Sequence, residues 1–196
     1  MKPARLNWGC GPQPAAGWIN SDVIAVPGVD LCCDIRSGLP IDGASIEYAV
    51  AMHALQDLQW LDVPVALGEL HRVLAPGGVL RLGLPDLDRA IDAYRRGDRD
   101  YFYIPDDDAR SLSGKLITQI IWYGSVRTPF TFDFIEELLL RAGFVCVTRC
   151  EFQRTASRFP DIVRLDNRPR ETLFVEAEKA AVGEMHRKSP SLPPPR

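Results

Sequence analysis

The sequence predicts an α/β fold built on a mostly parallel β-sheet. Short apolar runs alternate with amphipathic stretches along most of the chain, which is typical of strands joined by helices. The first apolar run is closed by a glycine-rich turn, Gly9-Cys10-Gly11-Pro12, of the kind that follows the first strand in many ligand-binding α/β proteins. The length of 196 residues allows one domain of ordinary size.

Seven segments are expected as strands because they are short, apolar and bounded by turn residues. The second segment ends at Asp22 and the third at Asp34. The seven segments are residues 4–8, 18–21, 29–33, 45–52, 79–84, 144–152 and 172–178.

The first expected helix follows Asp62, which can cap it, with Pro64 in its first turn, where a missing N–H costs little. Its apolar residues recur at helical spacing and predict one buried face. The helix should stop at residues 75–78, where Pro and Gly favour a turn. The apolar face consists of Val63, Leu67, Leu70 and Leu74.

Two further helices are expected. Asp86 can cap one that ends at Gly97, and another begins near Thr131 and ends at Gly143, where a left-handed residue is expected. Their apolar stripes are Leu87, Ala90, Ile91 and Tyr94, then Ile135, Leu138, Leu139 and Ala142.

The predicted domain spans residues 1–180. Within it, residues 97–130 interrupt the pattern and are expected to form an insertion with one helix beside the substrate site. Residues 181–196 are rich in proline and basic side chains and have nothing to pack, which predicts a flexible tail.

Charge and composition exclude several classes of protein. Lysine and arginine number 23 against 26 acidic residues, a net charge of −3, so we do not expect nucleic acid to be bound through bulk charge. No apolar run reaches the roughly 20 residues that span a bilayer, and no signal peptide is recognisable, so a cytoplasmic protein is expected. The five cysteines and three scattered histidines predict buried, reduced thiols and no metal site. The oligomeric state is left open.

The glycine turn suits S-adenosylmethionine (SAM) better than a dinucleotide. The dinucleotide fingerprint needs a third glycine where Pro14 stands, and a helix whose N-terminus faces the pyrophosphate. Only about one helical turn fits before Asp22, which also lies nearer than the usual acidic partner, about 20 residues on. SAM has no phosphate and loses less from the missing helix.

The motifs resemble those of class I SAM-dependent methyltransferases. Leu6-Asn7-Trp8-Gly9-Cys10-Gly11 is similar to their first motif, and Leu74-Ala75-Pro76-Gly77-Gly78 to their turn into the fifth strand. Residues 17–22, 84–87, 141–144 and 173–177 resemble a compact bacterial branch often found near sugar and surface-polysaccharide genes. The resemblance covers about residues 4–179. It implies a Rossmann-like, seven-stranded sheet with an antiparallel C-terminal hairpin.

The resemblance also implies a set of cofactor-binding residues. The glycines let the backbone approach the methionine part of SAM, Asp22 accepts the ribose hydroxyls, Asp34 and Ile35 flank the adenine, and Met52 and His53 line the methyl end. The full set is Asn7, Gly9, Cys10, Gly11, Asp22, Asp34, Ile35, Met52 and His53. A carboxylate suits this task because it can accept hydrogen bonds from both hydroxyls of a diol.

Two positions depart from the family pattern. Asn7 stands where an acidic residue is usual, and Gln56-Asp57 stands where the branch carries Glu-His. The sequence therefore predicts a methyltransferase that acts on an unidentified small-molecule or sugar-related acceptor and releases S-adenosylhomocysteine (SAH), with His53 or Asp86 as general base. The alternative is a catalytically silent SAM- or SAH-binding protein that acts through partners. A nicotinamide-dependent oxidoreductase is a third hypothesis, disfavoured by Pro14.

Acceptor specificity should come from the 97–130 insertion and from the loop after residue 152. Within the insertion, Tyr123 and Arg127 are the expected substrate contacts, on position alone.

Overall fold

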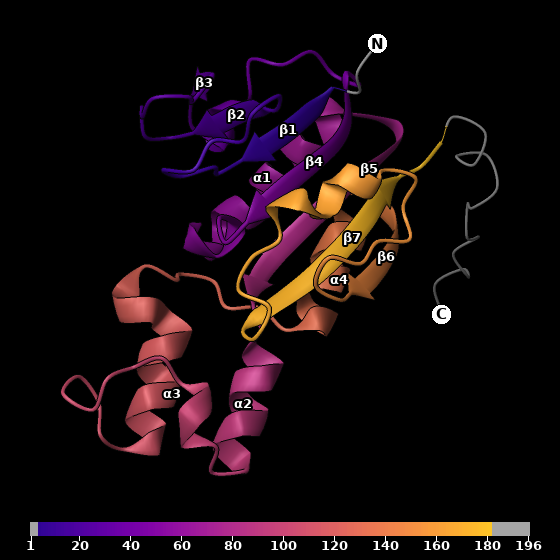
Figure 1. The fold of residues 1–196 in the computed structure, drawn as a ribbon. Coiled ribbons are helices and arrows are strands. Elements are labelled where there is room, and N and C mark those ends of the chain that lie inside the picture. Colours follow the sequence, from indigo (N-terminus) through magenta and orange to yellow (C-terminus); the bar gives the residue numbers. More distant parts are fainter. Residues whose placement is uncertain (1–3, 182–196) are drawn as a thin grey trace, which may run out of the picture.

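A computed structural model describes residues 4–181 and contains one seven-stranded sheet (Figure 1). The strand order is β3-β2-β1-β4-β5-β7-β6, and only β7 runs against its neighbours. The expected mostly parallel sheet with an antiparallel final hairpin is confirmed. The strands are β1 (Arg5–Trp8), β2 (Ile19–Asp22), β3 (Leu31–Cys32), β4 (Ile46–Met52), β5 (Leu74–Pro85), β6 (Phe144–Cys150) and β7 (Thr172–Lys179).

Four α-helices accompany the sheet within residues 4–181. They are α1 (Val63–Val73), α2 (Leu87–Arg95), α3 (Leu112–Ile121) and α4 (Phe132–Arg141). Asp86 caps α2 as predicted, α4 begins after Thr131 as predicted and is capped by it, and Gly143 has φ +95° after α4. Asp62 makes no capping hydrogen bond, which corrects the prediction, because its carboxylate instead accepts from the Arg36 guanidinium at 3.1 Å.

The predicted turn at residues 75–78 is a bulge within β5. Leu74 already pairs with Ile46 on β4, and pairing resumes between Val79 and Tyr48, so the residues between them loop out of the ladder. Gly77 has the positive φ, +74°, that the turn requires. The helix and strand are therefore joined directly, without a separate loop.

The two faces of the sheet are covered differently. Helices α1 and α4 cover one face, where their apolar stripes join the main core with Leu6, Leu82 and Val175 of the sheet. The other face is covered by residue 18 of the helix-free β1–β2 connection and by a 3₁₀ segment, Pro160–Leu165, whose Ile162 packs on Tyr48. The near absence of a first crossover helix was predicted. The 3₁₀ cover was not.

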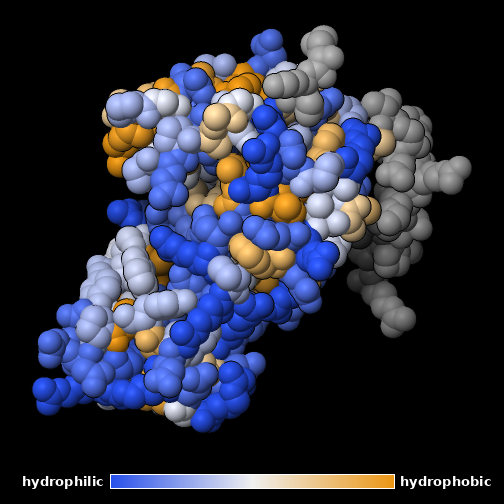
Figure 2. All heavy atoms as spheres, viewed as in Figure 1, coloured by the Kyte–Doolittle hydropathy of each residue, from blue (hydrophilic) through white to orange (hydrophobic). Residues whose placement is uncertain are grey.

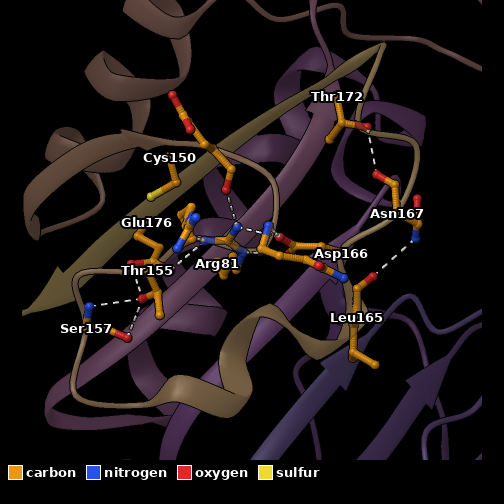
Figure 3. A network of polar contacts seen from close by, with 12 residues as sticks. Arg81, Cys150, Thr155, Ser157, Leu165, Asp166, Asn167, Thr172 and Glu176 are labelled. Carbon is orange, nitrogen blue, oxygen red and sulfur yellow. Dashed lines mark hydrogen bonds and ion pairs between the residues drawn. The ribbon is translucent and has the colours of Figure 1, made fainter.

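Arg81 on β5 connects the sheet face opposite α1 and α4 to the loop that follows β6 (Figure 3). Its side chain is fully buried and makes ion pairs with Asp166 and Glu176, both at 2.6 Å. It also donates to the carbonyls of Glu151 and Arg154 at 3.2 and 3.1 Å. All five guanidinium N–H donors thus have acceptors in the chain. This network fixes residues 151–171 on the sheet.

Helices α2 and α3 form a separate lobe below the sheet in Figure 1. We call residues 86–130 the α2–α3 lobe. Its small core is built on Ala90, Ala93, Tyr101 and Phe102, and its surface in Figure 2 is mainly hydrophilic. The expected single helix between residues 97 and 130 is α3. The expected stripe on α2 is partly wrong, because Tyr94 is exposed and Ala93 takes its place in the core.

Two expectations about composition can be compared with the structure. All five cysteines are free thiols, but none is buried, because Cys32 and Cys146 are exposed and the others are half-buried. Within residues 4–181, no helix has the length and apolar character needed to cross a membrane. Most of the predicted tail, from residue 182 on, lies outside the described residues.

Candidate functional site

Two adjoining cavities lie at the carboxyl ends of the parallel strands. One, of about 460 Å³, is walled by the ends of β1 and β2 and by residues 53–62; we call it the glycine-loop cavity. The other, of about 270 Å³, lies between the sheet edge and the α2–α3 lobe; we call it the lobe cavity. His53 and Asp57 line both. Open α/β sheets bind ligands at this edge, where the strand order reverses, and here it reverses between β1 and β4.

The glycine turn wraps closely around the end of β1. Gly9 and Gly11 line the glycine-loop cavity and have φ values of +67° and +55°, which favour glycine. A Cβ on Gly9 would lie 2.2 Å from the Cβ of Ala54, so no side chain fits there. The turn therefore brings bare backbone against the cavity.

Asp22 stands at the end of β2, as predicted, and lines the same cavity. One carboxylate oxygen accepts from the N–H of Gly11 at 2.7 Å, and the other from the N–H of Ile24 at 3.0 Å. Each oxygen keeps further acceptor capacity. Asp22 thus shapes the glycine turn and still presents an acceptor edge.

Asp34 also lines the glycine-loop cavity, but Arg36 occupies much of its carboxylate. Arg36 donates to it from two side-chain nitrogens, Nε and Nη2, at distances from 2.6 to 3.0 Å and reaches Asp62 with its remaining nitrogen, Nη1. These hydrogen bonds lower the pKa of Asp34 below its usual range, so the carboxylate is ionised at neutral pH. The wall is therefore an Asp-Arg-Asp array.

Four predicted cofactor residues do not line either cavity. Asn7 is buried and donates to the side chain of Asn20 at 3.0 Å, not to the glycine turn. Ile35 belongs to the main core. Met52 lies on the other face of the sheet, away from that core, and packs against Gly83. Cys10 follows Gly9 in the turn, and its thiol donates to the carbonyl of Gly11 at 3.6 Å. Their side-chain roles in binding stay predictions.

His53 sits between the two cavities in a left-handed conformation, φ +53°. One ring nitrogen, Nε2, lies 2.9 Å from the hydroxyl of Thr172 on β7. Burial, with a smaller contribution from Arg168, lowers the pKa of His53 to about 4. The imidazole is therefore neutral at physiological pH and lines both cavities, and its role in the site stays a prediction.

Gln56 and Asp57 lie in a 3₁₀ turn (Leu55–Asp57); both line the lobe cavity, and Asp57 also lines the glycine-loop cavity. The Gln56 amide nitrogen donates to the Asp57 carboxylate at 3.2 Å, while its oxygen Oε1 is buried with no hydrogen-bond partner among the described residues. Burial raises the pKa of Asp57. The sequence singled out this pair only as a departure from a family pattern.

The carboxylate of Asp86, the second predicted base, lines the lobe cavity but is completely paired. One oxygen caps α2 by accepting from the N–H of Arg89, and the other lies 2.6 Å from Arg149 and 3.2 Å from the Arg89 side chain. A carboxylate held by two guanidinium groups favours the capping role over proton transfer.

Three further polar residues that line the lobe cavity were not predicted from the sequence, because no functional motif contains them. Tyr101 belongs to the lobe, and burial raises its pKa to about 12. Glu171 and Arg168 come from the loop after β6; their nearest charged atoms lie 3.8 Å apart, and burial raises the pKa of Glu171. Both expected sources of specificity, the insertion and this loop, therefore meet at the lobe cavity.

Tyr123 and Arg127, the two insertion residues expected to contact the substrate, lie in different places. Tyr123 lines neither cavity, and its hydroxyl donates to Asp108 instead. Arg127 lines the glycine-loop cavity and not the lobe cavity. Within residues 4–181, no cluster of His, Cys, Asp or Glu is arranged to hold a metal ion.

Comparisons with known proteins agree with this architecture. A family model described as a methyltransferase domain matches residues 23–82. A SAM-dependent methyltransferase from Thermotoga maritima, a possible histamine N-methyltransferase, superposes with a TM-score of 0.55 at 16% identity, over 91% of this chain and 83% of that one. The chain has the SAM-dependent methyltransferase fold.

Two further structures with this fold extend the comparison. A SAM-dependent methyltransferase from Mesorhizobium loti has a TM-score of 0.53 at 18% identity, with 90% of each chain covered. The 1,6-didemethyltoxoflavin-N1-methyltransferase of Burkholderia thailandensis, solved with its substrate and SAH, has a TM-score of 0.51 at 16% identity, over 91% of this chain and 72% of that chain. A search of curated protein sequences finds no match.

Proposed function

We propose that the protein is a SAM-dependent methyltransferase that binds SAM in the glycine-loop cavity and a small polar acceptor in the lobe cavity. The observation that carries this proposal is the junction of the two cavities at His53 and Asp57. A methyl donor in one cavity and a nucleophile in the other would meet there. Holding two reactants in this way can lower a barrier by several kcal/mol, and about 7–11 kcal/mol in well-oriented cases.

The residues of the glycine-loop cavity suit SAM in size and chemistry. A volume of about 460 Å³ falls within the range of about 300–1,000 Å³ that is usual for ligand pockets. Gly9 and Gly11 leave room for close approach, and the Asp22 carboxylate can accept the two ribose hydroxyls. Asp34 offers an ionised edge to the adenine amine, and Arg127 offers a partner for the methionyl carboxylate. When bound, SAM would supply a methyl group on a positively charged sulfur.

The chain's own residues would position the acceptor and exclude water. The α2–α3 lobe covers the lobe cavity, with Tyr101 as a protonated donor at neutral pH. The hydrogen bond to Thr172 would hold the neutral His53 ring between the two ligands. Similar structures include enzymes that methylate small molecules, which supports a small-molecule acceptor here.

Thermal unfolding with SAM, SAH and NAD tests the proposal. A ligand at 100 times its Kd stabilises the folded state by about 2.7 kcal/mol, which for a chain of this length raises the Tm by about 5–11 °C. We expect this shift with SAM and SAH and none with NAD. Stabilisation by NAD alone would refute the proposal. Binding of SAM and SAH without methylation of any acceptor would favour the silent SAM-binding protein instead.

A further inference from the structure

The hydrogen bond between His53 and Thr172 determines which nitrogen of the imidazole carries the proton. The Thr172 side chain is completely buried, and its hydroxyl has one hydrogen to donate. The carbonyl of Arg168 lies 2.8 Å from the hydroxyl oxygen, and that of Asn167 lies 3.3 Å away (Figure 3). A carbonyl can only accept, so these carbonyls take the hydroxyl hydrogen. The hydroxyl oxygen is then left to accept from His53 Nε2, at 2.9 Å.

His53 is therefore the tautomer with its proton on Nε2 and a lone pair on Nδ1. Burial lowers the pKa of His53 to about 4, so no second proton occupies Nδ1 at physiological pH. Nδ1 has no hydrogen-bond partner among residues 4–181, yet the buried side-chain atoms without a partner in this range consist of Gln56 Oε1 alone. Nδ1 is therefore accessible, on a side chain that lines both cavities.

The backbone of His53 is held as firmly as its ring. Its N–H donates to the carbonyl of Gly83 at 2.8 Å, and its φ of +53° is a left-handed conformation that side chains adopt only where the surroundings impose it. With the ring held at Nε2 and the backbone held on β5, the direction of the Nδ1 lone pair is fixed before any ligand binds.

The charges of the lobe cavity do not require a charged ligand, because each of the three carboxylates on its wall has a cationic neighbour. The pairs are Asp57 with Arg127, Asp86 with Arg89 and Arg149, and Glu171 with Arg168 and Arg170. Tyr101 adds a hydroxyl that has no partner among residues 4–181, and burial raises its pKa to about 12. His53 Nδ1 and the Tyr101 hydroxyl are thus two open neutral groups, one an acceptor and one a donor.

We propose that the lobe cavity takes a neutral acceptor whose reacting atom carries a proton, as a hydroxyl or a ring N–H does, and that His53 Nδ1 receives this proton. Thr172 is the positioning residue, because its hydroxyl keeps the other ring nitrogen protonated. The inference rests on the proposed methyl transfer. Ile120, Trp122 and Val126 supply an apolar wall for the body of the acceptor.

The transfer is balanced in atoms and electrons. The proton leaves the reacting atom for Nδ1, and an electron pair on that atom forms the bond to the SAM methyl carbon. The methyl–sulfur bond breaks with its electron pair left on sulfur, which yields neutral SAH. The positive charge then resides on the His53 imidazolium until solvent takes the proton, a release that the low pKa of His53 favours.

Nitrogen NMR of protein labelled at histidine tests the tautomer. The chain has only three histidines, and His53→Gln identifies the signals of His53. At pH 7 with SAH bound, we expect a protonated Nε2 and an unprotonated Nδ1. Thr172→Val removes the hydroxyl from a side chain of the same shape, so the two tautomers should mix, and Thr172→Ser should restore the single tautomer. Thr148→Val, an exposed change on β6, is the matched control and should leave the tautomer unchanged.

A proton on Nδ1 in the wild-type protein would overturn the inference, whether or not Thr172→Val folds. An unchanged tautomer in folded Thr172→Val would show that Thr172 has no positioning role and would also overturn it.

Paired ligands test the class of acceptor. The SAH-saturated protein receives phenol, benzyl alcohol or indole at millimolar concentration, and in parallel their methylated counterparts anisole, benzyl methyl ether and 1-methylindole. We expect at least one protic ligand to shift the Nδ1 signal of His53 and its methylated counterpart to leave the signal in place. The inference is wrong if no protic ligand shifts the signal or if the methylated ligands shift it equally. Absence of SAH binding to the wild-type protein in calorimetry would instead refute the proposed methyltransferase function.

Discussion

Replacing Arg81 with methionine tests what holds the wall of the lobe cavity in place. The change leaves Asp166 and Glu176 with buried charge and leaves the carbonyl of Arg154 without a donor (Figure 3). The carbonyl of Glu151 loses one of two donors and keeps the backbone N–H of Arg154 at 3.1 Å. It also removes a guanidinium that lies 5.2 Å from the centre of a phenyl ring on β7. Removing one partner of a buried ion pair costs about 3–5 kcal/mol. For a chain of this length the Tm should fall by about 6–20 °C.

Asp166 and Glu176 each keep one hydrogen bond after the substitution, so the effect of their uncompensated charge can be separated from the loss of Arg81 packing. Asp166 keeps the backbone N–H of Gln153 at 2.8 Å, and Glu176 keeps the hydroxyl of Thr155 at 2.9 Å. Adding Asp166→Asn and Glu176→Gln to Arg81→Met removes the uncompensated charges while preserving these two contacts. We expect the triple variant to recover more than half of the lost free energy of unfolding.

Urea unfolding monitored by circular dichroism at pH 7 measures each free energy. Arg141→Met is the matched control, because Arg141 pairs with Glu137 on the exposed surface of α4, where such a pair contributes about 0–1 kcal/mol. The argument is wrong if Arg81→Met costs no more than Arg141→Met, or if the triple variant is no more stable than the single one.

Two further predictions concern the glycine turn and the histidine. Gly9→Ala sets a Cβ 2.2 Å from that of Ala54, so we expect the Kd for SAH, measured by calorimetry, to rise about tenfold or more. Gly97→Ala, with a similar φ of +71° but open space around it, should leave this Kd unchanged. The pKa of His53 is about 4 in the folded protein, against 6.5 for an unperturbed histidine. Its contribution to the free energy of unfolding is therefore complete above pH 6.5 and falls as the pH drops toward 4. The total loss is about 3 kcal/mol. His53→Gln should flatten this part of the stability curve in urea unfolding at pH 7 and 4.5, and parallel curves would contradict the assignment.

The fold could be predicted because local signals and global arrangement agree. The period of apolar residues located the strands and the helices α1 and α4, and their caps at Thr131 and Gly143 follow from side-chain chemistry that acts within one turn. Asp62 fails as a cap for a tertiary reason: Arg36, 26 residues away in sequence, takes its carboxylate. Competition of this kind has no local signature.

The site was predicted less completely than the fold. Met52 was expected at the cofactor because it ends β4, but side chains alternate across a strand, and Met52 shares the face of Tyr48 and Val50 and lines neither cavity. Its role in binding stays a prediction. The positions of Glu171 and Arg168 were not predictable, because the irregular loop that carries them is fixed by a buried ion pair across the sheet.

The buried ion pair and the orphaned amide oxygen have opposite meanings for function. At Arg81 every donor has its acceptor, so the network is complete without any ligand and its role is to hold residues 151–171. At Gln56 the amide oxygen is buried without a hydrogen-bond partner among residues 4–181, beside the Asp57 carboxylate that lines both cavities. A complete buried network strengthens the fold, whereas an unpaired buried acceptor costs about 1–3 kcal/mol. The contacts within the chain therefore stabilise the sheet around Arg81 more than the turn that carries Gln56.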